Sequence, residues 1–269
     1  MASVTVAIAV DIHEKRYPGR AGAEPVTALR NLQARVAPSE FCVITGPSGC
    51  GKTTLLNIIA GLDRDFAGTL SFAPSDSGVP RIGYVFQSPR LLPWRTVREN
   101  VALVRPRHAD KTELDGLLTD VGVADMADAY PAQLSGGMAR RAALARAFAI
   151  APDLLLMDEP FLSLDAAAAD RLRRLLLRLV SARPATVLFV THDLAEAVEL
   201  ADRVLVVSPA PGRVVAEMPI VLPRDRRRDC NTLAALRTEL TRLAGHPIEA
   251  PDTAKITFSR RNSLTPTKE

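Results

Sequence analysis

A glycine-rich segment between an apolar run and a helical pattern constrains this chain more than any other feature. Residues 46–54 match the pattern G-x-x-x-x-G-K-[ST] and directly follow the apolar run 41–44. A helical pattern over 52–60 comes next. A strand, a glycine loop and a helix in this order point backbone N–H groups at a phosphate, and the helix dipole adds positive potential. The alternative, a glycine-rich turn that binds nothing, fits this flanking context less well.

The phosphate loop supplies the first set of candidate binding residues. Within it, Lys52 would neutralise phosphate charge, and the Thr53 hydroxyl would be a ligand of Mg²⁺. The whole set expected to hold a nucleotide is Gly46, Pro47, Ser48, Gly49, Cys50, Gly51, Lys52, Thr53 and Thr54. The motif alone leaves open which class of nucleotide-binding protein this is.

Composition narrows the class of protein. The chain has 269 residues, 47% of them hydrophobic, which is enough to bury a full core in one large domain with a subdomain. Its 34 basic and 30 acidic residues are intermixed, so no electrostatic footprint for nucleic acid is expected. Three cysteines are too few for a disulfide framework and favour a reducing cytoplasm. No apolar run approaches the roughly 18 residues of a membrane span, so membrane association would need a partner.

Strand and helix patterns alternate along most of the chain and predict an α/β fold. Continuous apolar runs at 41–44, 154–157, 186–190 and 204–207 are typical of parallel strands covered on both faces. Apolar residues alternate with other residues over 4–12, which indicates a half-buried antiparallel strand. The expected architecture is a P-loop NTPase core with a RecA-like parallel sheet, an N-terminal antiparallel β subdomain and an inserted helical subdomain.

The domain boundaries follow from these patterns. Residues 1–223 form one domain, and its helical subdomain covers about 88–150, where 97–104, 112–121 and 136–150 have helical patterns. A linker and an amphipathic helix at 232–243 follow within 224–250, and the tail 251–269 is expected to be disordered. The arginine run 224–229 has two interpretations, a phosphate or lipid contact and a solvated linker, and its flanking aspartates favour the linker.

A second anion-binding signal lies at the start of the 136–150 helix. Ser135 is an N-cap candidate, and two glycines after it expose backbone N–H groups at a helix N-terminus. Alone, such a sequence is usually just a helix cap. Beside a phosphate loop it becomes a second anion site, which one nucleotide in one protomer does not need. The residues of this second motif are Leu134, Ser135, Gly136 and Gly137.

Two strands end in polar side chains that should lie beside the phosphate loop. The run 154–157 is followed by Asp158 and Glu159, and the run 186–190 is followed by Thr191 and His192. Since ligands bind at the carboxyl ends of parallel strands, Asp158 is a candidate ligand of Mg²⁺ and Glu159 a candidate base for the attacking water. The alternatives are that the carboxylates merely end a strand and that His192 is structural.

The chain resembles the nucleotide-binding subunits of ATP-binding cassette (ABC) transporters over about residues 3–220. Five ordered motifs carry the resemblance: the phosphate loop, Gln87 within 83–87, the signature 134–137, the segment 158–160 and the segment 191–193. The resemblance implies ATP and Mg²⁺ as cofactors. It assigns Gln87 to magnesium and water, Glu159 to the general base and His192 to sensing the γ-phosphate.

The resemblance also implies an adenine contact and a dimer. Tyr17 is placed like the aromatic residue that stacks on adenine, although it could be an ordinary aromatic at a strand end. In this family two subunits pack head to tail, and each signature caps the ATP held by the other. Ser135, Gly136 and Gly137 would then act in trans, and Asp165 would contact the opposite subunit. This resolves the puzzle of two anion sites in one chain.

Finer resemblance is to importers of the nitrate, sulfonate and taurine group, carried by segments 91–100, 158–161 and 207–213. It implies that ATP hydrolysis powers uptake of a small solute through a separate transmembrane permease, on the cytoplasmic face of the inner (plasma) membrane. The permease would dock on 88–94, where Leu91, Leu92 and Trp94 either form an interface or pack inside the subdomain. An extracytoplasmic binding protein would choose the solute, which could be nitrate, a sulfonate, taurine or a vitamin precursor.

Three residues depart from the family pattern, and two other classes of protein remain as alternatives. Arg140 stands where related signatures usually carry Gln, Ser39 replaces a common Gly, and Leu162 replaces Gly or Ser. A soluble ABC ATPase acting on nucleic acid or ribosomes would usually carry a coiled-coil insertion or a second cassette, and neither is present. A P-loop kinase or GTPase would lack the 134–137 signature and the His192 strand.

Overall fold

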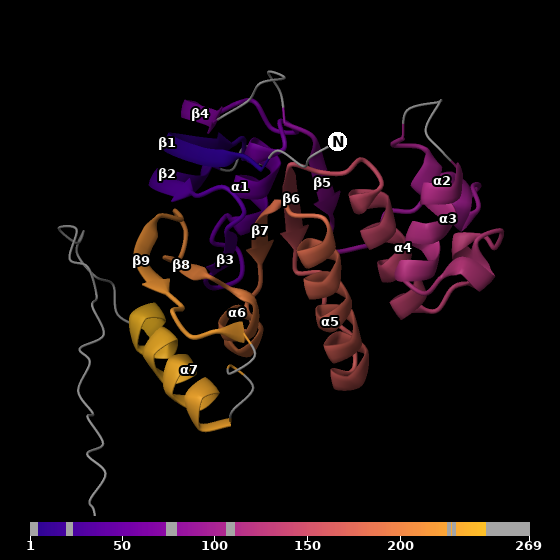
Figure 1. The fold of residues 1–269 in the computed structure, drawn as a ribbon. Coiled ribbons are helices and arrows are strands. Elements are labelled where there is room, and N and C mark those ends of the chain that lie inside the picture. Colours follow the sequence, from indigo (N-terminus) through magenta and orange to yellow (C-terminus); the bar gives the residue numbers. More distant parts are fainter. Residues whose placement is uncertain are drawn as a thin grey trace, which may run out of the picture.

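The computed structural model describes residues 5–19, 24–73, 80–105, 111–224, 227 and 230–245, which form two sheets with helices around them (Figure 1). The larger sheet has six strands in the order β5-β6-β7-β3-β8-β9. Their bounds are β3 (Phe41–Thr45), β5 (Ile82–Val85), β6 (Leu154–Asp158), β7 (Thr186–Val190), β8 (Arg203–Val207) and β9 (Val214–Pro219). The first five are parallel, and β9 pairs antiparallel with β8.

The central strands of this sheet are buried at every residue. Each residue of β3, β6 and β7 is inaccessible to solvent, as expected for strands with helices on both faces. Two hydrophobic clusters lie on the two sides of the sheet, one with Phe41 and Phe189, the other with Ile44 and Leu156. The parallel core predicted from the apolar runs is therefore confirmed.

The smaller sheet is antiparallel and has the order β2-β1-β4. Its strands are β1 (Ala7–Tyr17), β2 (Val26–Val36) and β4 (Ala67–Ala73). Alternate residues of β1, from Ile8 to Ile12, are buried, which is the period-2 pattern read from the sequence. The antiparallel N-terminal sheet is thus confirmed, although β2 and β4 were not foreseen.

Between β5 and β6 the chain forms a helical lobe, seen on the right in Figure 1. It contains α2 (Val97–Ala102), α3 (Lys111–Asp120) and α4 (Gly136–Phe148), with short 3₁₀ turns at Ala124–Met126 and Pro131–Gln133. Thr96 and Glu99 form a reciprocal capping box that fixes where α2 begins. The three helices predicted in this region are all present, so the inserted helical subdomain is confirmed as an architectural feature.

Four further helices complete the fold. They are α1 (Lys52–Ile59), α5 (Ala166–Ala182), α6 (Leu194–Leu200) and α7 (Cys230–Gly245). The helix α7 includes the amphipathic segment predicted at 232–243, and it packs against α6 through buried residues such as Leu240. The tail predicted for 251–269 lies outside the described residues.

Arg224 and Arg227 are the two residues of the arginine run 224–229 that the structure describes. Arg227 is only 3% exposed and donates hydrogen bonds to the carbonyls of Leu222 (2.7 Å), Ile220 (3.2 Å) and Ala201. Arg224 pairs with Asp202 at 2.8 Å. Solvation is therefore wrong as the expectation for Arg227, because carbonyls at the ends of α6 and β9 supply acceptors that the sequence pattern does not reveal, whereas Arg224 is exposed.

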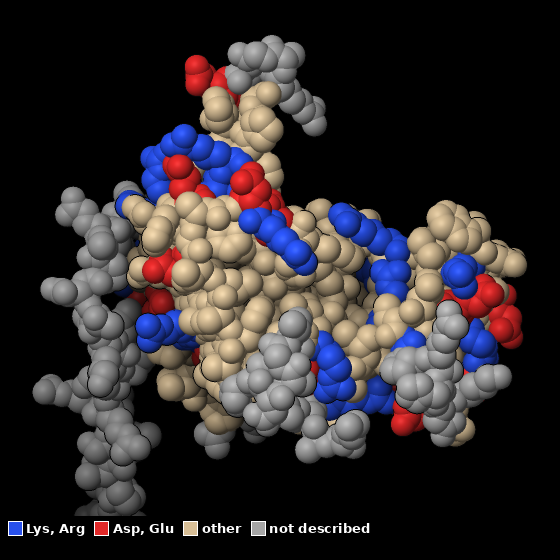
Figure 2. All heavy atoms as spheres, turned by 90° about the horizontal axis from the view of Figure 1, so that it is seen from above, with Lys and Arg blue, Asp and Glu red and all other residues tan. Residues whose placement is uncertain are grey.

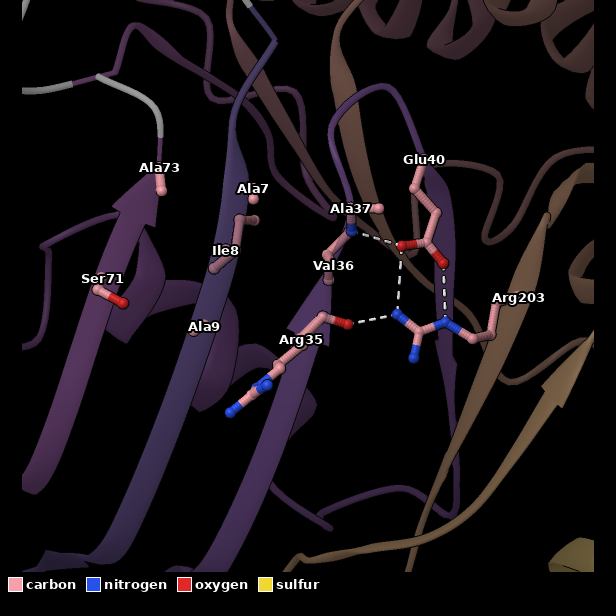
Figure 3. Close-up of a pocket in the computed structure, with 10 residues that line it drawn as sticks. All are labelled: Ala7, Ile8, Ala9, Arg35, Val36, Ala37, Glu40, Ser71, Ala73 and Arg203. Atoms are coloured by element: carbon pink, nitrogen blue, oxygen red, sulfur yellow. Dashed lines mark hydrogen bonds and ion pairs between the residues drawn. The ribbon is translucent and has the colours of Figure 1, made fainter. Parts of the chain in front are cut away.

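A cavity of about 530 Å³ lies where the two sheets meet (Figure 3). Glu40 accepts hydrogen bonds there from Arg203 Nε (2.7 Å) and from the N–H of Ala37 (2.7 Å). Arg203 also donates to the carbonyl of Arg35. This ion pair joins β8 to the loop after β2. It therefore fixes the position of the smaller sheet relative to the larger one.

Candidate nucleotide site

A cleft of about 430 Å³ collects most of the candidate residues at the carboxyl ends of β3 and β6. It is the position at which α/β sheets bind ligands. Its lining residues are Tyr17, Val26, Thr27, Ala28, Ser48, Gly49, Gly51, Lys52, Thr53, Thr54, Gln87, Asp158, Glu159 and Ala210. Residues far apart in sequence thus meet in one place, as the motifs predict.

The phosphate loop is held by close backbone contacts and by its own lysine. Gly51, the N-cap of α1, has φ +98°, and a Cβ there would lie 2.5 Å from a methyl group of Leu29. Only glycine fits this position. Lys52 Nζ, in a side chain 6% exposed, donates to the carbonyls of Gly46 and Pro47 at 2.8 Å each. The ammonium group is therefore fixed at the loop, where a phosphate would meet it.

Oxygen ligands suitable for magnesium lie beside the loop. Thr53 Oγ1 donates a hydrogen bond of 2.9 Å to Asp158 Oδ2, and Gln87 lines the same cleft. Burial raises the pKa of the Asp158 carboxyl and the neighbouring Glu159 raises it further, whereas the bond from Thr53 lowers it. A hard cation prefers hydroxyl, amide and carboxylate oxygens of this kind and would neutralise the buried carboxylate, so the residues present fit Mg²⁺.

The candidate base and the candidate sensor are in contact. Glu159 Oε2 lies 3.3 Å from His192 Nδ1, across the ends of the neighbouring strands β6 and β7. The backbone of Glu159 has φ +43°, and its N–H donates to the carbonyl of Val190 at 2.9 Å. A non-glycine residue in the left-handed region is strained, and strain of this kind clusters at functional sites. This contact brings together two residues that the sequence predicts at the same edge of the sheet.

Tyr17 lies at the open side of the cleft and is anchored by its hydroxyl. The hydroxyl contacts Asp63 Oδ2 at 2.9 Å and Thr54 Oγ1 at 3.3 Å, while Lys15 Nζ lies 4.5 Å from the ring centroid. The side chain is 37% exposed. These contacts tie the end of β1 to the beginning of α1. Stacking of Tyr17 on adenine stays a prediction.

The signature residues do not line the cleft of their own chain. Ser135 is the N-cap of α4 and accepts a hydrogen bond from the N–H of Met138 at 3.3 Å. Ser135 and Gly136 are exposed, and Leu134 packs partly against the core. Asp165 caps α5 by accepting from the N–H of Ala168 at 2.8 Å. The cap predicted at Ser135 is therefore present, the cap at Asp165 was not predicted, and a role of these residues in trans stays a prediction.

Two sets of contacts around the site were not foreseen. Arg140, noted in the sequence only as a departure, donates to the carbonyls of Gln87, Pro160 and Leu162. Thr191 donates a 2.7 Å bond to the buried Glu196 carboxylate just before His192. The bonds of Arg140 link segments that are separate in the sequence, and the unusual arginine was the one signal that could have drawn attention to them. The bond from Thr191 to Glu196 is local, because the two residues are five positions apart.

The fold and this cleft define a P-loop ATPase. The combination is a glycine loop that opens α1, a threonine and an aspartate with oxygens for Mg²⁺, and a glutamate beside a histidine at the next strand. The sequence profile of ABC transporters matches residues 29–162. The chain belongs to the ABC transporter family.

Named relatives place the chain more finely within that family. The aliphatic sulfonates import ATP-binding protein SsuB 2 of Burkholderia lata is 46% identical over 217 residues, which are 80% of this chain and 80% of the relative. Aliphatic sulfonates import ATP-binding protein SsuB 1 of Pseudomonas aeruginosa is 47% identical over 219 residues, 78% of this chain and 88% of the relative. The chain is therefore similar to import ATP-binding proteins, which disfavours the nucleic-acid alternative.

Solved structures show the same fold. The ATP-binding cassette MJ0796, in a dimeric post-hydrolysis structure bound to ADP and Pi, superposes with a TM-score of 0.69 at 30% identity. The match covers 80% of this chain and all of that one. No helix within the described part of this chain is long and apolar enough to cross a membrane.

Proposed function

We propose that this chain is the ATP-hydrolysing subunit of an importer that takes up aliphatic sulfonates through a separate permease. The observation that carries the ATPase role is the convergence of Lys52, Asp158, Glu159 and Gln87 on one cleft, with His192 in contact with Glu159. The sulfonate class rests on the names of relatives that are 46% and 47% identical. Nitrate and taurine are the competing solutes within the same group.

Different residues of the cleft have different roles in ATP hydrolysis. The loop amides and Lys52 bind the phosphates, and Thr53 and Asp158, with Gln87, would hold Mg²⁺. The bound ion would neutralise charge on the phosphates. Glu159 orients the attacking water and takes its proton, since its carboxylate lies in the cleft beside the phosphate loop. His192, which touches Glu159, would contact the terminal phosphate.

The complete site requires a second copy of the chain. The N-terminus of α4 is exposed and does not line its own cleft, which suits a phosphate held by another subunit. Leu134, Ser135, Gly136 and Gly137 would cap the partner's ATP, and Asp165 would lie at the same interface. Support for this arrangement comes from the dimeric cassettes that share the fold. ATP then joins the two subunits, and hydrolysis releases them.

A surface groove on the helical lobe offers a docking site for the permease. The groove, of about 380 Å³, lies between β5, α2 and α4 and is bordered by Leu92, Leu103, Val104 and Arg90. Trp94 stands beside it on the same loop and is 70% exposed, whereas Leu91 packs partly against the core. An exposed apolar groove next to Gln87 suits a short apolar helix of a membrane protein. Docking there would place the subunit at the cytoplasmic face of the inner membrane.

The surface charge gives no competing signal for nucleic acid. Figure 2 shows basic and acidic side chains interspersed among uncharged ones on the face drawn there. A protein that binds nucleic acid usually gathers its basic residues into a stripe. The mixed charge on this face is therefore more typical of the transporter than of an ATPase that acts on nucleic acid or ribosomes.

The docking site is tested by Val104→Asp, which adds a charge to the groove at a side chain that is 41% exposed. We expect the variant to fold, with an unchanged Tm, and to lose co-purification with the permease. Thr112→Asp on the neighbouring helix α3 provides a comparison with the same change of charge outside the groove. Equal recovery of the permease with Val104→Asp and with wild type would rule the groove out.

The solute class is tested by reconstituting this subunit with its permease and solute-binding protein in lipid vesicles. An alkanesulfonate is expected to stimulate ATP hydrolysis, and nitrate and taurine are expected to stimulate it less. The same complex with Glu159→Gln measures the background. Stimulation by nitrate alone would reject the sulfonate assignment, and stimulation by taurine alone would reject a simple alkanesulfonate as the solute, because taurine is an amino-substituted sulfonate. Recovery with nucleic acid, without a permease, would reject the importer role.

A further inference from the structure

Arg140 holds together two loops that carry site residues. Its Nη1 donates to the carbonyl of Gln87 at 3.1 Å and to the carbonyl of Pro160 at 2.8 Å, and its Nη2 donates to the carbonyl of Leu162. Pro160 and Leu162 directly follow Glu159. One guanidinium group therefore binds the backbone at Gln87 and the backbone of the segment that follows Glu159.

The chemistry of the contact requires an arginine. The three acceptors come from two loops, and a planar guanidinium carries five donors in a fixed fork. A glutamine side chain, which related signatures usually carry here, has two N–H donors on one nitrogen and a shorter reach. Every hydrogen bond that Arg140 makes within the described residues goes to a carbonyl. The side chain therefore acts through backbone position rather than through an ion pair.

The helix that carries Arg140 also carries the signature. Arg140 lies five residues after Ser135, the N-cap of α4, which is a rise of about 7.5 Å along the helix. Movement of the signature would therefore move the guanidinium, and the guanidinium would move the loops at Gln87 and Glu159. Arg146 on the same helix reinforces the connection, because it donates to the carbonyls of Pro89 (2.8 Å) and Arg90 (2.7 Å).

We infer that Arg140 is a positioning residue that couples the two ATP sites of the dimer. Binding of the partner's ATP at the signature shifts α4, and Arg140 transmits that shift to Gln87 and to the segment after Glu159 in its own chain. The inference rests on the proposed function, because it requires the signature to act in trans. It adds a direct connection from α4 to the loops at Gln87 and Glu159, which the motifs themselves do not predict.

The matched control is Arg141, the next residue of the same helix. Its Nη1 also donates to backbone carbonyls, those of Gly122 (2.8 Å) and Val121 (3.5 Å), but these lie inside the helical lobe. Arg141→Gln thus removes the same kind of side chain and the same kind of bond without touching either catalytic loop. Arg140 makes three bonds of this kind and Arg141 makes two, so the comparison mainly tests which loops the bonds reach.

The experiment compares wild type, Arg140→Gln, Arg140→Lys and Arg141→Gln by ATP affinity, kcat and the Hill coefficient for ATP hydrolysis. Arg140→Gln should bind a fluorescent ATP analogue within about twofold of wild type, because no phosphate ligand is removed. Its kcat should fall about tenfold, which two lost positioning bonds would account for. Its Hill coefficient should fall from about 2 towards 1 as the two sites become independent. Arg140→Lys, which keeps a charge but has one donor atom, should be intermediate.

Three results would overturn the inference. Arg140→Gln could keep the kcat and Hill coefficient of wild type, it could change no more than Arg141→Gln, or it could lose ATP affinity in proportion to kcat. Should Arg140→Gln fail to fold in a thermal melt, Arg140→Lys decides the same question. Failure of the proposed function is distinguishable, because wild-type protein would then hydrolyse no ATP or would show no dependence on Glu159.

Discussion

At the scale of single residues, Lys52 shows how the nucleotide site is prepared by the fold. Its ammonium group is bound by two carbonyls of the loop that it serves, so the loop is folded around the position of a phosphate. Asp158 and Thr53 are similarly paired beside it. These contacts reduce the ordering that ATP must bring about when it binds.

We expect Lys52→Ala to weaken ATP binding by roughly 10- to 100-fold, because hydrogen bonds made by a charged donor are among the strongest in proteins. Titration with a fluorescent ATP analogue measures the change. The folded state should persist, since α1 keeps Leu55, Leu56 and Ile58 in the core. ATP bound as tightly by the variant as by wild type would refute the phosphate-binding role of Lys52.

Glu196 gives a prediction about pH. Burial raises the pKa of its carboxyl, which accepts a 2.7 Å bond from Thr191, faces Arg173 at 4.0 Å, and lies near Asp193 and His192. A carboxyl whose pKa is higher in the folded state binds its proton more tightly there. Its contribution to stability is therefore lost as pH rises from the unfolded pKa through the folded pKa.

Glu196→Gln keeps an acceptor for Thr191 and removes the buried charge. We expect its Tm to exceed that of wild type by a few degrees at pH 7, and the difference to disappear near pH 4, where the wild-type carboxyl is protonated in both states. Thermal melts across this range measure the effect. A variant that is less stable than wild type at pH 7 but not near pH 4 would contradict the prediction, because it would show that the ion pair with Arg173 outweighs the cost of burying the charge.

At the scale of elements, a single buried side chain shapes the loop between β5 and α2. The fully buried Asn100 donates to the carbonyls of Leu92 (3.2 Å), Arg95 (3.0 Å) and Thr96 (2.9 Å). Its Oδ1 accepts from the N–H of Leu92 at 2.7 Å. A side chain of α2 therefore holds the backbone of the loop that presents Trp94 beside the groove.

Asn100→Ala should lower the free energy of unfolding by about 2–4 kcal/mol, because it removes a fully buried polar side chain and its bonds to the part-buried N–H of Leu92 and carbonyl of Arg95. Denaturant titration measures the loss. Gln133→Ala is the matched control, since its exposed side chain makes a comparable bond to the N–H of Tyr130, and a cost below about 1 kcal/mol is expected there. Equal costs for the two variants would contradict the account of Asn100.

The sequence predicts some strands of this fold clearly and others poorly. The buried strands β3, β6 and β7 are continuous apolar runs, so their pattern is unmistakable. The strand β4 is mostly exposed and contains a glycine, and nothing in its pattern separates it from a loop. In β2, Leu32, Ala34 and Val36 do alternate with polar residues, and this was an available signal.

The sequence likewise predicts part of the candidate site and misses the rest. Strand ends and a glycine loop predict that Lys52, Asp158, Glu159 and His192 lie close together, and they do, because the topology of parallel sheets brings such ends to one edge. The contacts of Arg140 and Glu196 depend on how helices pack against those loops. Packing of this kind depends on side-chain positions in three dimensions, and the order of residues does not encode it in any local pattern.

At the scale of the whole molecule, the proposed function gives the chain two halves of different sites. One half is the cleft with the phosphate loop, and the other is the exposed N-terminus of α4. Two copies packed head to tail would complete both sites at once. The central claim is therefore that ATP forms the dimer and that Glu159 ends it by hydrolysis.

The most direct test measures molar mass and ATP turnover together in Glu159→Gln with ATP and Mg²⁺. The account predicts a stable dimer that retains ATP, with turnover reduced at least about a hundredfold. Adding Gly136→Glu should return the protein to a monomer, since a Cβ at Gly136 meets nothing within 4 Å in the folded chain but would bring a carboxylate against the partner's phosphates. Near-normal hydrolysis by Glu159→Gln, or a monomer in the presence of ATP, would contradict the account.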